Sequence, residues 1–464
     1  MKTSPSLLGP LLLAVPGVLG AITVDIDDAD SVKAAAALVA EDLLTFYHGN
    51  EPGNTPGIFG DSPSNGDYYW WTGSVLWGTL LDLRSRTGNT TYDDTILEGL
   101  QFQVGTNDDY MPANFTASMG NDDQGFWAQA ALLAEETGFV DPPSGDPQWL
   151  ALAQTVFKVQ TEAIRRVSDN NSCAGALRWQ ILPINNGYDY VNTASNAGYF
   201  SIGAQLAFLT KNQTYSDEAA KTYDLLTKIG LVDDDFNAYD GVLAPTCDSI
   251  TKFQFSYNAG LLLQGSAYLY NYTNDDVWKT RLDGLLDRTL EVFFPDGIAV
   301  ERACETADTC TTDMEFFKGI LHRSLASVID VAPYTADKIL PVLKTSAKAA
   351  ASTCTGGDNG RMCGFEWSGN DTKNSTSAGA QSNVLAALVS VLSTTESTSS
   401  IGSGSGNNTS GGGAGSGGSG DGGSENGGSG SSNSTGGVGG SMGANVGVSF
   451  SALVGGLIVA TFLG

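Results

Sequence analysis

The chain has 464 residues, with 23 Lys and Arg against 51 Asp and Glu, so its formal net charge is −28 at pH 7. This charge disfavours nucleic acid and anionic membranes as partners. The two histidines, His48 and His322, fall in predicted helices away from other metal-ligand side chains, which indicates packed or surface roles. Histidine-based triads and most zinc sites are therefore excluded, and no phosphate-binding glycine motif indicates nucleotide chemistry.

Both ends of the chain carry targeting patterns. Lys2 and the apolar run that follows predict a signal peptide over residues 1–20. Residues 395–445 are almost wholly Ser, Gly, Asn and Thr, which predicts a disordered, glycosylated linker. Residues 446–464 are apolar with no Lys or Arg after them, which favours a GPI-anchor signal over an ordinary membrane helix. Residues 21–394 remain as one domain.

Apolar residues in this domain recur with helical spacing, and turn residues separate the stripes. The spacing predicts about twelve helices, near residues 31–48, 70–87, 93–104, 122–137, 147–167, 192–210, 213–230, 255–271, 275–294, 312–331, 335–353 and 377–393. Short links alternate with long polar and aromatic ones. Six hairpins closing into a ring would give an all-α (α/α)6 toroid, with the long loops forming a cleft on one face. An open α-solenoid is the alternative, but no fixed-period repeat supports it.

A run of four aromatic residues precedes the second predicted helix. Asp67 comes directly before Tyr68, Tyr69, Trp70 and Trp71. Because four consecutive rings cannot all face inward, one or two should line the cleft. Asp67 is either a helix N-cap or a carboxylate that contacts sugar hydroxyls.

Two adjacent acids, Asp122 and Asp123, lie at the start of the fourth predicted helix, after Asn121. Asn121 suits an N-cap and acids in a first turn are stabilised by the helix dipole, so a structural role is one interpretation. The other is glycoside chemistry, which needs only two carboxyl groups. Neighbouring residues at a helix start can hold their carboxyl groups about 5–6 Å apart, nearer to the retaining than the inverting separation. One ionised Asp also raises the pKa of the other, which keeps a proton available.

Later predicted loops repeat the mixture of amides, acids and aromatic rings that suits sugar binding. The candidate sugar contacts are Asp67, Tyr68, Trp70, Trp71, Gln124, Trp127, Trp179, Tyr188, Asn192, Asn196, Tyr239, Asp240, Tyr257 and Asn258. No metal or other cofactor is expected, although the acidic run Asp233 to Asp235 could hold calcium incidentally.

Six cysteines in a secreted chain predict disulfides. Locality favours Cys304–Cys310 and Cys354–Cys363, which leaves Cys173–Cys247, as one of 15 possible pairings. Glycosylation sequons occur at Asn89, Asn114, Asn170, Asn212, Asn271, Asn370 and Asn374.

Several runs of the chain resemble fungal glycoside hydrolase family 76. They are Asp67–Ser74, Asp109–Pro112, Gly120–Trp127, Leu177–Gln180, Gly187–Tyr190, Tyr239–Gly241, Ser256–Asn258 and Glu301–Glu305. The resemblance covers roughly residues 25–393 and is strongest to the GPI-anchored cell-wall branch of mannan endo-1,6-α-mannosidases. It implies an (α/α)6 fold and retention of anomeric configuration, with Asp122 as the nucleophile and Asp123 as the general acid/base.

Three functions follow from these expectations. The first is a retaining endo-acting α-1,6-mannosidase that acts on α-1,6-linked mannan or mannose-containing glycans in fungal cell-wall biogenesis. The second is a transglycosidase that transfers the GPI-core glycan of GPI proteins onto cell-wall glucan. The third is a non-catalytic mannan-binding wall protein. We expect the protein to be secreted and GPI-anchored at the outer face of the plasma membrane or in the wall. The sequence does not distinguish water from a sugar as the acceptor.

Overall fold

The computed structural model describes residues 21–59, 68–168, 173–369 and 376–393. The chain divides into two units, 1–403 and 404–464, and every described residue belongs to the first. No described helix is long and apolar enough to cross a bilayer. Outside the described residues lie the predicted signal peptide, linker and GPI signal, together with Asp67, Asn170, Asn370 and Asn374.

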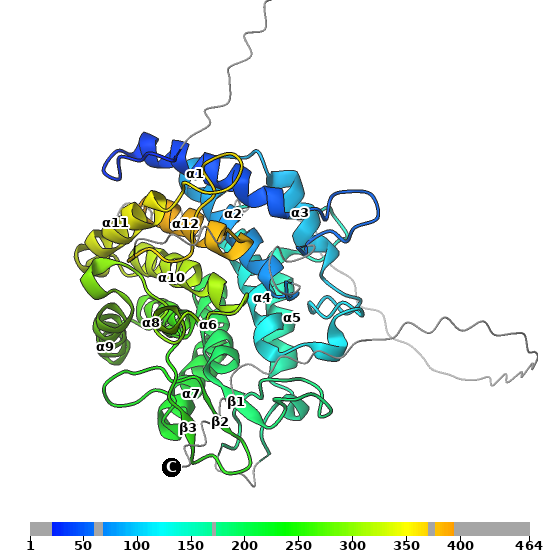
Figure 1. The fold of residues 1–464 in the computed structure, drawn as a ribbon. Helices are drawn as coiled ribbons and strands as arrows, with labels where there is room; N and C mark the ends of the chain where they lie inside the picture. The colour runs from blue at the N-terminus through cyan, green and yellow to red at the C-terminus, as the bar shows by residue number, and fades with distance from the viewer. Residues whose placement is uncertain (1–20, 60–67, 169–172, 370–375, 394–464) are drawn as a thin grey trace, which may run out of the picture. The chain divides into compact units, whose positions relative to one another are not determined.

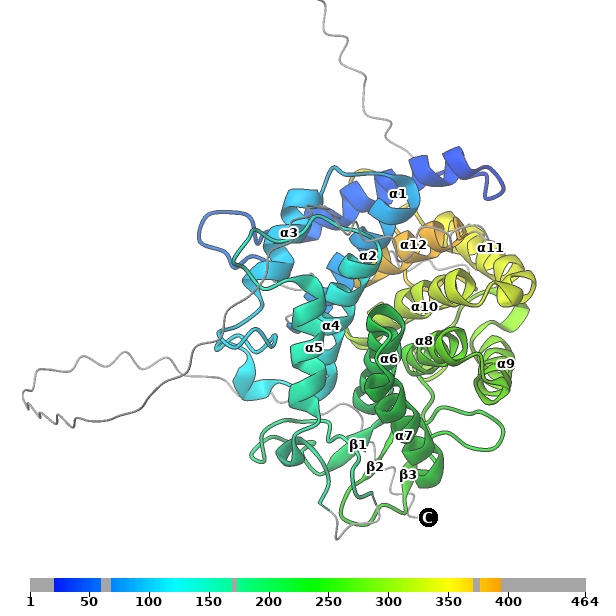
Figure 2. The ribbon, with the colours of Figure 1, turned by 180° about the vertical axis from the view of Figure 1, so that it is seen from behind.

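The described residues form twelve α-helices that alternate between an inner and an outer position (Figures 1 and 2). The inner helices are α2 (Thr72–Thr87), α4 (Asn121–Glu136), α6 (Thr193–Thr210), α8 (Ser256–Thr273), α10 (Phe317–Val331) and α12 (Ala378–Ser390). The outer helices are α1 (Ala29–Leu43), α3 (Asp93–Phe102), α5 (Trp149–Gln160), α7 (Gln213–Ile229), α9 (Asp276–Phe293) and α11 (Ala336–Ser352). Each inner helix contacts the next, and α12 contacts α2, so the six inner helices close into a ring. The predicted (α/α)6 fold is confirmed.

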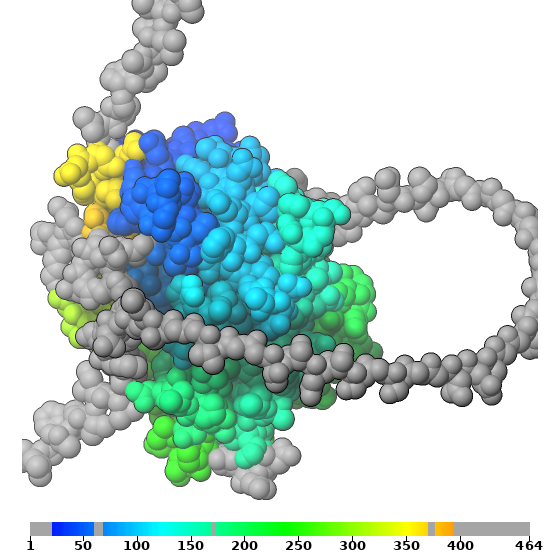
Figure 3. Space-filling model, turned by 90° about the vertical axis from the view of Figure 1, so that its right-hand side faces the viewer, coloured from blue at the N-terminus to red at the C-terminus, as the bar shows by residue number. Residues whose placement is uncertain are grey.

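Five inner helices form a hairpin with the outer helix that follows them in sequence. The sixth pair joins the two ends of the domain, because α1 packs against α12. On the face shown in Figure 3, the yellow and orange residues from the end of the domain lie beside the blue residues from its start. The chain therefore closes its ring through space rather than through a turn.

The burial of the helices reflects their place in the fold. The inner helix α6 buries 15 of its 18 residues, because neighbouring helices cover it on all sides. The outer helix α7 buries a single stripe spaced by three or four residues, made of Ser216, Ala219, Thr222, Tyr223 and Leu226. The sequence therefore distinguishes an amphipathic outer layer from an inner layer that is apolar almost all round.

The long loops all precede inner helices, so they gather at one end of the ring, here called the N-terminal end. Three contacts between the starts of inner helices define it. Trp71 Nε1 donates to Asp313 Oδ1 at 2.8 Å, and Asn192 Nδ2 donates to Asp122 Oδ2 at 2.7 Å. The backbone N–H of Ala378 donates to Tyr68 Oη at 3.0 Å. Because the N-terminus of each helix carries partial positive charge, this end favours acidic groups.

Three short strands lie within these loops, and the helical prediction missed them. They are β1 (Tyr190–Asn192), β2 (Gly241–Leu243) and β3 (Ile250–Thr251), paired antiparallel in that order. Each is only two or three residues long, too short for an alternating pattern to show in the sequence.

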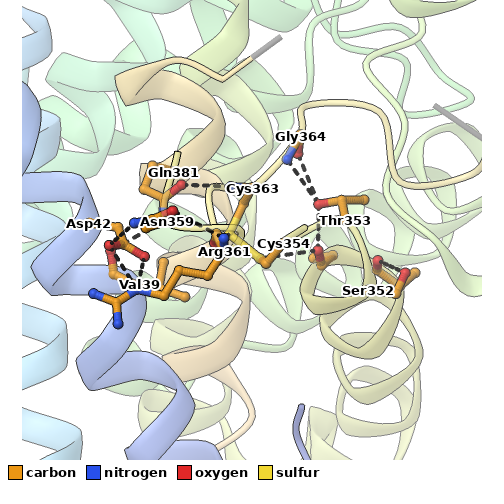
Figure 4. Close-up of a disulfide and its surroundings, with 12 residues drawn as sticks. Val39, Asp42, Ser352, Thr353, Cys354, Asn359, Arg361, Cys363, Gly364 and Gln381 are labelled. Carbon is orange, nitrogen blue, oxygen red and sulfur yellow. Dashed lines mark hydrogen bonds and ion pairs between the residues drawn. A yellow bond between two sulfur atoms is a disulfide. The ribbon is translucent and has the colours of Figure 1, made fainter. Parts of the chain in front are cut away.

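The structure contains the three disulfides that locality favoured, Cys173–Cys247, Cys304–Cys310 and Cys354–Cys363. Figure 4 shows the last of these in the loop before α12. Beside it, Arg361 Nε donates to Asp42 Oδ2 of α1 at 2.9 Å, and the Cys363 N–H donates to Gln381 Oε1 of α12 at 2.9 Å. The loop thus connects the first and last helices of the ring.

Candidate active site

The predicted acid pair lies in the first turn of α4, at the N-terminal end of the ring. The N-cap of this helix is Gly120, so the prediction that Asn121 caps it is wrong. The Asn121 side chain instead donates to the Arg178 carbonyl at 2.9 Å and accepts from Arg165 Nη1 at 2.7 Å. The cap is supplied by Asp123, whose Oδ2 accepts from the Gly120 N–H at 2.7 Å. The local fold therefore orients the Asp123 carboxylate back over the start of the helix.

A buried polar layer beneath the pair fixes the start of α4. Arg165 Nη1 also donates to Gln124 Oε1 at 2.9 Å, and Gln124 Nε2 donates to the Asp109 carbonyl at 2.6 Å. Gln160 Nε2 donates to the Asn121 carbonyl at 2.8 Å. These side chains hold the first turn of α4 against the loops on both sides, which limits the movement of the two acids.

The two carboxylates converge above Gly120, and both are partly exposed. A Cβ placed on Gly120 would lie 2.3 Å from Asp122 Oδ1 and 3.3 Å from Asp123 Oδ2. These oxygens therefore lie within about 6 Å of each other, which is below the roughly 6.5–9.5 Å of inverting glycosidases and compatible with the roughly 5–5.5 Å of retaining ones. The same geometry explains the glycine, since any side chain there would occupy the space of the Asp122 carboxylate.

The surroundings give the two acids different pKa values. Burial raises the pKa of Asp122 to about 6, while hydrogen bonds from Asn192 and from the Asp123 N–H limit the rise. Burial and the negative charge of Asp122 raise the pKa of Asp123 well above its ordinary value. Asp122 therefore ionises first, and Asp123 keeps its proton to higher pH. The pair can supply one nucleophilic carboxylate and one proton donor.

A third acid, Asp313, faces the pair from the segment that leads into α10. Burial raises its pKa to about 6, and Trp71 donates a hydrogen bond to it. Its charge raises the pKa of both Asp122 and Asp123. Asp313 was absent from the predicted site, although an acid just before an aromatic helix start repeats the pattern at Asp122.

Four of the predicted sugar contacts lie around the pair. Trp179 Nε1 would be 3.2 Å from a Cβ on Gly120. Asn192 donates to Asp122, so it positions the acid, and Asp240 accepts from Tyr190 Oη at 2.6 Å. Burial raises the pKa of Tyr257 most, and the charges of Asp240, Asp122 and Asp313 raise it further. This phenol therefore lies among the three acids. These groups line one polar and aromatic surface.

The predicted sugar contact is wrong for four residues because their side chains are fully buried: Gln124, Trp127, Asn196 and Asn258. Trp127 stacks on Trp70 in the core. Asn196 bonds the backbone of Leu177, and so fixes the loop that carries Trp179. Burial follows from how neighbouring helices cover these positions, which their chemical character does not reveal.

The aromatic run before α2 is mostly core. Trp70 lies between Phe115 and Trp127, and Tyr68 contacts Phe316. Tyr69 is the exposed member, at 50% of its surface. Trp71, nearly buried, reaches the site through its bond to Asp313. Tyr188 stacks under the Arg178 guanidinium at 4.2 Å, and Tyr239 bonds Asp233, so neither reaches the acid pair in the described contacts.

Among the described residues, no group of three or more His, Cys, Asp or Glu side chains is placed to hold a metal ion. Asp233 instead accepts hydrogen bonds from Asn237 and Tyr239, which lower its pKa despite partial burial.

His322 is buried between Lys318 and Ser346, and His48 pairs with Glu51 at 2.9 Å. Both histidines thus have the packed or surface roles predicted.

Four of the predicted glycosylation sites lie among the described residues, and all four are exposed or partly exposed: Asn89, Asn114, Asn212 and Asn271.

An (α/α)6 ring with two close, partly exposed acids fits a glycosidase-type protein. Comparison with known proteins gives the family, since residues 31–401 match the family model described as Glycosyl hydrolase family 76. The chain is 44% identical over 350 residues to mannan endo-1,6-alpha-mannosidase DCW1 of Saccharomyces cerevisiae, covering 75% of this chain and 76% of the yeast protein.

Two solved structures are also similar. Dfg5 from Chaetomium thermophilum, in complex with glucosamine, has a TM-score of 0.75 and 46% identity, covering 79% of this chain and 92% of that one. The fold also matches an inactive alpha-1,6-mannanase variant from Salegentibacter with alpha-1,6-mannotriose, at a TM-score of 0.62 and 16% identity, over 78% of this chain and 99% of that one. The chain belongs to glycosyl hydrolase family 76 and is a glycosidase.

Proposed function

We propose that this protein is a retaining, endo-acting α-1,6-mannosidase of fungal cell-wall biogenesis, with α-1,6-linked mannan or a related mannose-containing glycan as its substrate. The observation that carries the proposal is the convergence of Asp122 and Asp123 over Gly120, with Asp122 the more readily ionised. The name of the yeast relative, mannan endo-1,6-alpha-mannosidase, supports the substrate class.

In the proposed mechanism each acid acts in both of two steps. The Asp122 carboxylate attacks the anomeric carbon while Asp123 gives its proton to the departing glycosidic oxygen, which leaves a mannosyl ester on Asp122. Asp123, now ionised, then removes a proton from an incoming hydroxyl, whose oxygen displaces Asp122 at the anomeric carbon. Two displacements at one carbon retain its configuration.

Azide rescue tests these roles. With a 2,4-dinitrophenyl α-mannoside, Asp122→Ala should lose at least about 10³-fold in kcat. Added azide should then restore turnover and give a β-mannosyl azide, because azide replaces the nucleophile. With Asp123→Ala, azide should instead attack the ester and give the α-mannosyl azide. An α-azide from Asp122→Ala would contradict the assignment. Asp94→Asn, an exposed acid in the first turn of α3, is the control.

The second candidate is transfer, in which a sugar hydroxyl replaces water in the second step. The glucosamine complex of Dfg5 favours it, because the core glycan of GPI anchors contains glucosamine whereas α-1,6-mannan does not. The donor would be the GPI-core glycan and the acceptor wall glucan. Mass spectrometry of products with and without a β-glucan oligosaccharide measures the ratio of transfer to hydrolysis.

We also propose that the protein is secreted and held at the cell surface by a GPI anchor. The apolar run at 446–464 after the small-residue tract supports this placement. Treatment of intact protoplasts with a phosphatidylinositol-specific phospholipase should release the enzyme. Retention in the membrane after complete cleavage of a known GPI protein would contradict the anchor.

A further inference from the structure

A second candidate site lies at the N-terminal end of the ring. A hollow of about 480 Å³ is lined by Lys252 and Phe253 from the loop before α8, by Arg288 from α9 and by Arg302 from the loop before α10. Glu291 also lines it and pairs with Arg288 at 2.7 Å. The lining thus has three cations and one anion, on a chain that carries more than twice as many acids as bases.

Specific contacts hold two of these cations in place. Arg288 Nε donates to Asn237 Oδ1 at 2.7 Å, and Lys252 Nζ lies 5.3 Å from the centre of the Tyr239 ring. Asn237 and Tyr239 both donate to Asp233 Oδ2, at 2.9 and 2.8 Å. The acidic run that could have bound calcium therefore uses its first carboxylate to organise the wall of the hollow.

Arg302 is positioned by its neighbour in the sequence. The Glu301 carboxylate is buried and accepts from the Ser256 N–H at 3.1 Å, which ties the loop before α10 to the start of α8. Arg302 itself is exposed, as is Lys252. No ion pair of either side chain occurs among the described residues, so both can accept an external anion.

A row of aromatic rings connects this hollow to the acid pair. Phe126, one turn after the acids on α4, has its ring centre 6.2 Å from that of Tyr257. Tyr257 is 6.2 Å from Phe255, and Phe255 is 6.5 Å from Phe253 in the hollow. These steps are comparable with the length of one hexose, and Phe253 is 50% exposed. Phe126 is buried and backs the row, whereas Tyr257 and Phe255 are partly exposed, so the rings from Tyr257 to Phe253 offer successive apolar surfaces for sugar rings.

We propose that the hollow binds a phosphate group carried by the glycan substrate, with the sugars between it and the cleaved bond lying along the aromatic row. The inference rests on the proposed glycosidase function and extends it to the substrate class. Guanidinium and ammonium groups from three segments of the chain suit the tetrahedral, multi-oxygen form of phosphate. Neutral mannan would use the row but not the hollow.

The test compares hydrolysis of α-1,6-mannopentaose with that of the same sugar phosphorylated at its reducing or its non-reducing end. For one of the two positions we expect kcat/KM to be about tenfold higher than for the neutral sugar, with a preference that weakens as salt is added. In the double variant Lys252→Gln/Arg302→Gln the ratio of phosphorylated to neutral kcat/KM should fall to about one. Lys158→Gln/Lys228→Gln, which removes two exposed lysines on α5 and α7, is the charge-matched control and should keep the wild-type ratio.

A further arm uses the ethanolamine phosphodiester of the same sugar. A stronger preference for the diester would indicate an anchor-type glycan, and a stronger preference for the monoester a phosphorylated mannan; either supports a phosphate subsite. Equal kcat/KM for all sugars, or a ratio that survives the double variant, would overturn it. Calorimetric binding to Asp122→Asn gives the same ratio without turnover. Failure to cleave even the neutral sugar would count against the proposed function, while this binding ratio would still decide the subsite.

Discussion

The two ends of the inner ring both contain buried or partly buried acids, but these acids have different partners at the two ends. At the C-terminal end, where the inner helices finish, Asp82 and Asp330 are paired with arginines. Arg323 Nε lies 2.6 Å from Asp82, and Arg86 Nη2 lies 2.7 Å from Asp330. At the N-terminal end, Asp122, Asp123 and Asp313 have no Lys or Arg partner among the described ion pairs.

This difference separates acids that stabilise the fold from acids that can react with a substrate. The pairs of acid and arginine hold neighbouring helices together, because the cation offsets the cost of burying the acid. Acids left without a cation have raised pKa values, so protons can move between them and a substrate near neutral pH. Helix N-termini, rather than arginines, compensate the charge at the catalytic end. Three such acids together thus mark the reactive end of the ring, whereas Glu136 is a single such acid at the other end.

The largest effect is expected from removing the proton donor. Asp123→Asn should lower kcat on α-1,6-mannan by about 10²–10⁴-fold, because general acid catalysis of a poor leaving group is lost. With a 2,4-dinitrophenyl leaving group, which needs no proton, the first step should be nearly unaffected. Burst kinetics separate the two steps. An equal loss with both substrates would argue against Asp123 as the acid.

At the opposite end, removing a cation should damage folding instead of catalysis. Arg86→Met leaves Asp82 and Asp330 incompletely paired and should lower the free energy of unfolding by about 3–5 kcal/mol. Activity per folded molecule should stay near that of wild type. Denaturant unfolding measures this effect. Arg84→Met, on the same helix but in a more exposed pair with Asp93, should cost less than about 1 kcal/mol.

Gly120→Ala tests the geometry of the pair without changing any charge. The backbone of Gly120, at φ −88° and ψ 163°, accepts alanine, but the new methyl group would lie 2.3 Å from Asp122 Oδ1. Displacement of the carboxylate should lower kcat by about 10²-fold with little change in melting temperature. Unchanged kcat would mean that the position of Asp122 is not critical.

Glu136 at the C-terminal end should make the fold less stable as pH rises. Burial raises its pKa from 4.5 to about 7, although a hydrogen bond from Tyr268 acts to lower it. Between pH 4.5 and about pH 7 the folded state therefore binds more protons than the unfolded state. Stability from this group is therefore present below about pH 4.5 and is lost as pH rises towards 7. Glu136→Gln should reduce the difference in unfolding free energy between pH 5 and pH 8 by on the order of 2 kcal/mol. An unchanged difference would contradict the raised pKa.

The smallest effect concerns the pH profile of activity. Activity should rise through about pH 6 as Asp122 ionises, and fall at higher pH as Asp123 loses its proton. Because the charge of Asp313 raises the pKa of Asp122, Asp313→Asn should move the acidic limb of kcat/KM down by about half a unit. Asparagine keeps the acceptor for Trp71. The limb should not move in Asp94→Asn, and an upward shift in Asp313→Asn would refute the coupling.

The amino-acid sequence alone determined the helical repeat, the disulfide pairing favoured by locality and the position of Asp122 and Asp123 at a helix start. These features are local: apolar spacing, loop length and adjacent residues express them within a few turns of chain. The same local reasoning misassigned Trp127 and Asn258, since their chemical character suits a sugar site while their burial depends on neighbouring helices.

Tertiary structure alone decided which acids carry a cation and which do not. Asp313 lies about 190 positions from the pair it faces, and Arg86 reaches Asp330 across 244 positions. The same holds for the row of rings from Phe126 to Phe253 and for the cations gathered around its end. Ring closure brings these groups together, and no short-range pattern encodes a contact between residues so far apart in the chain.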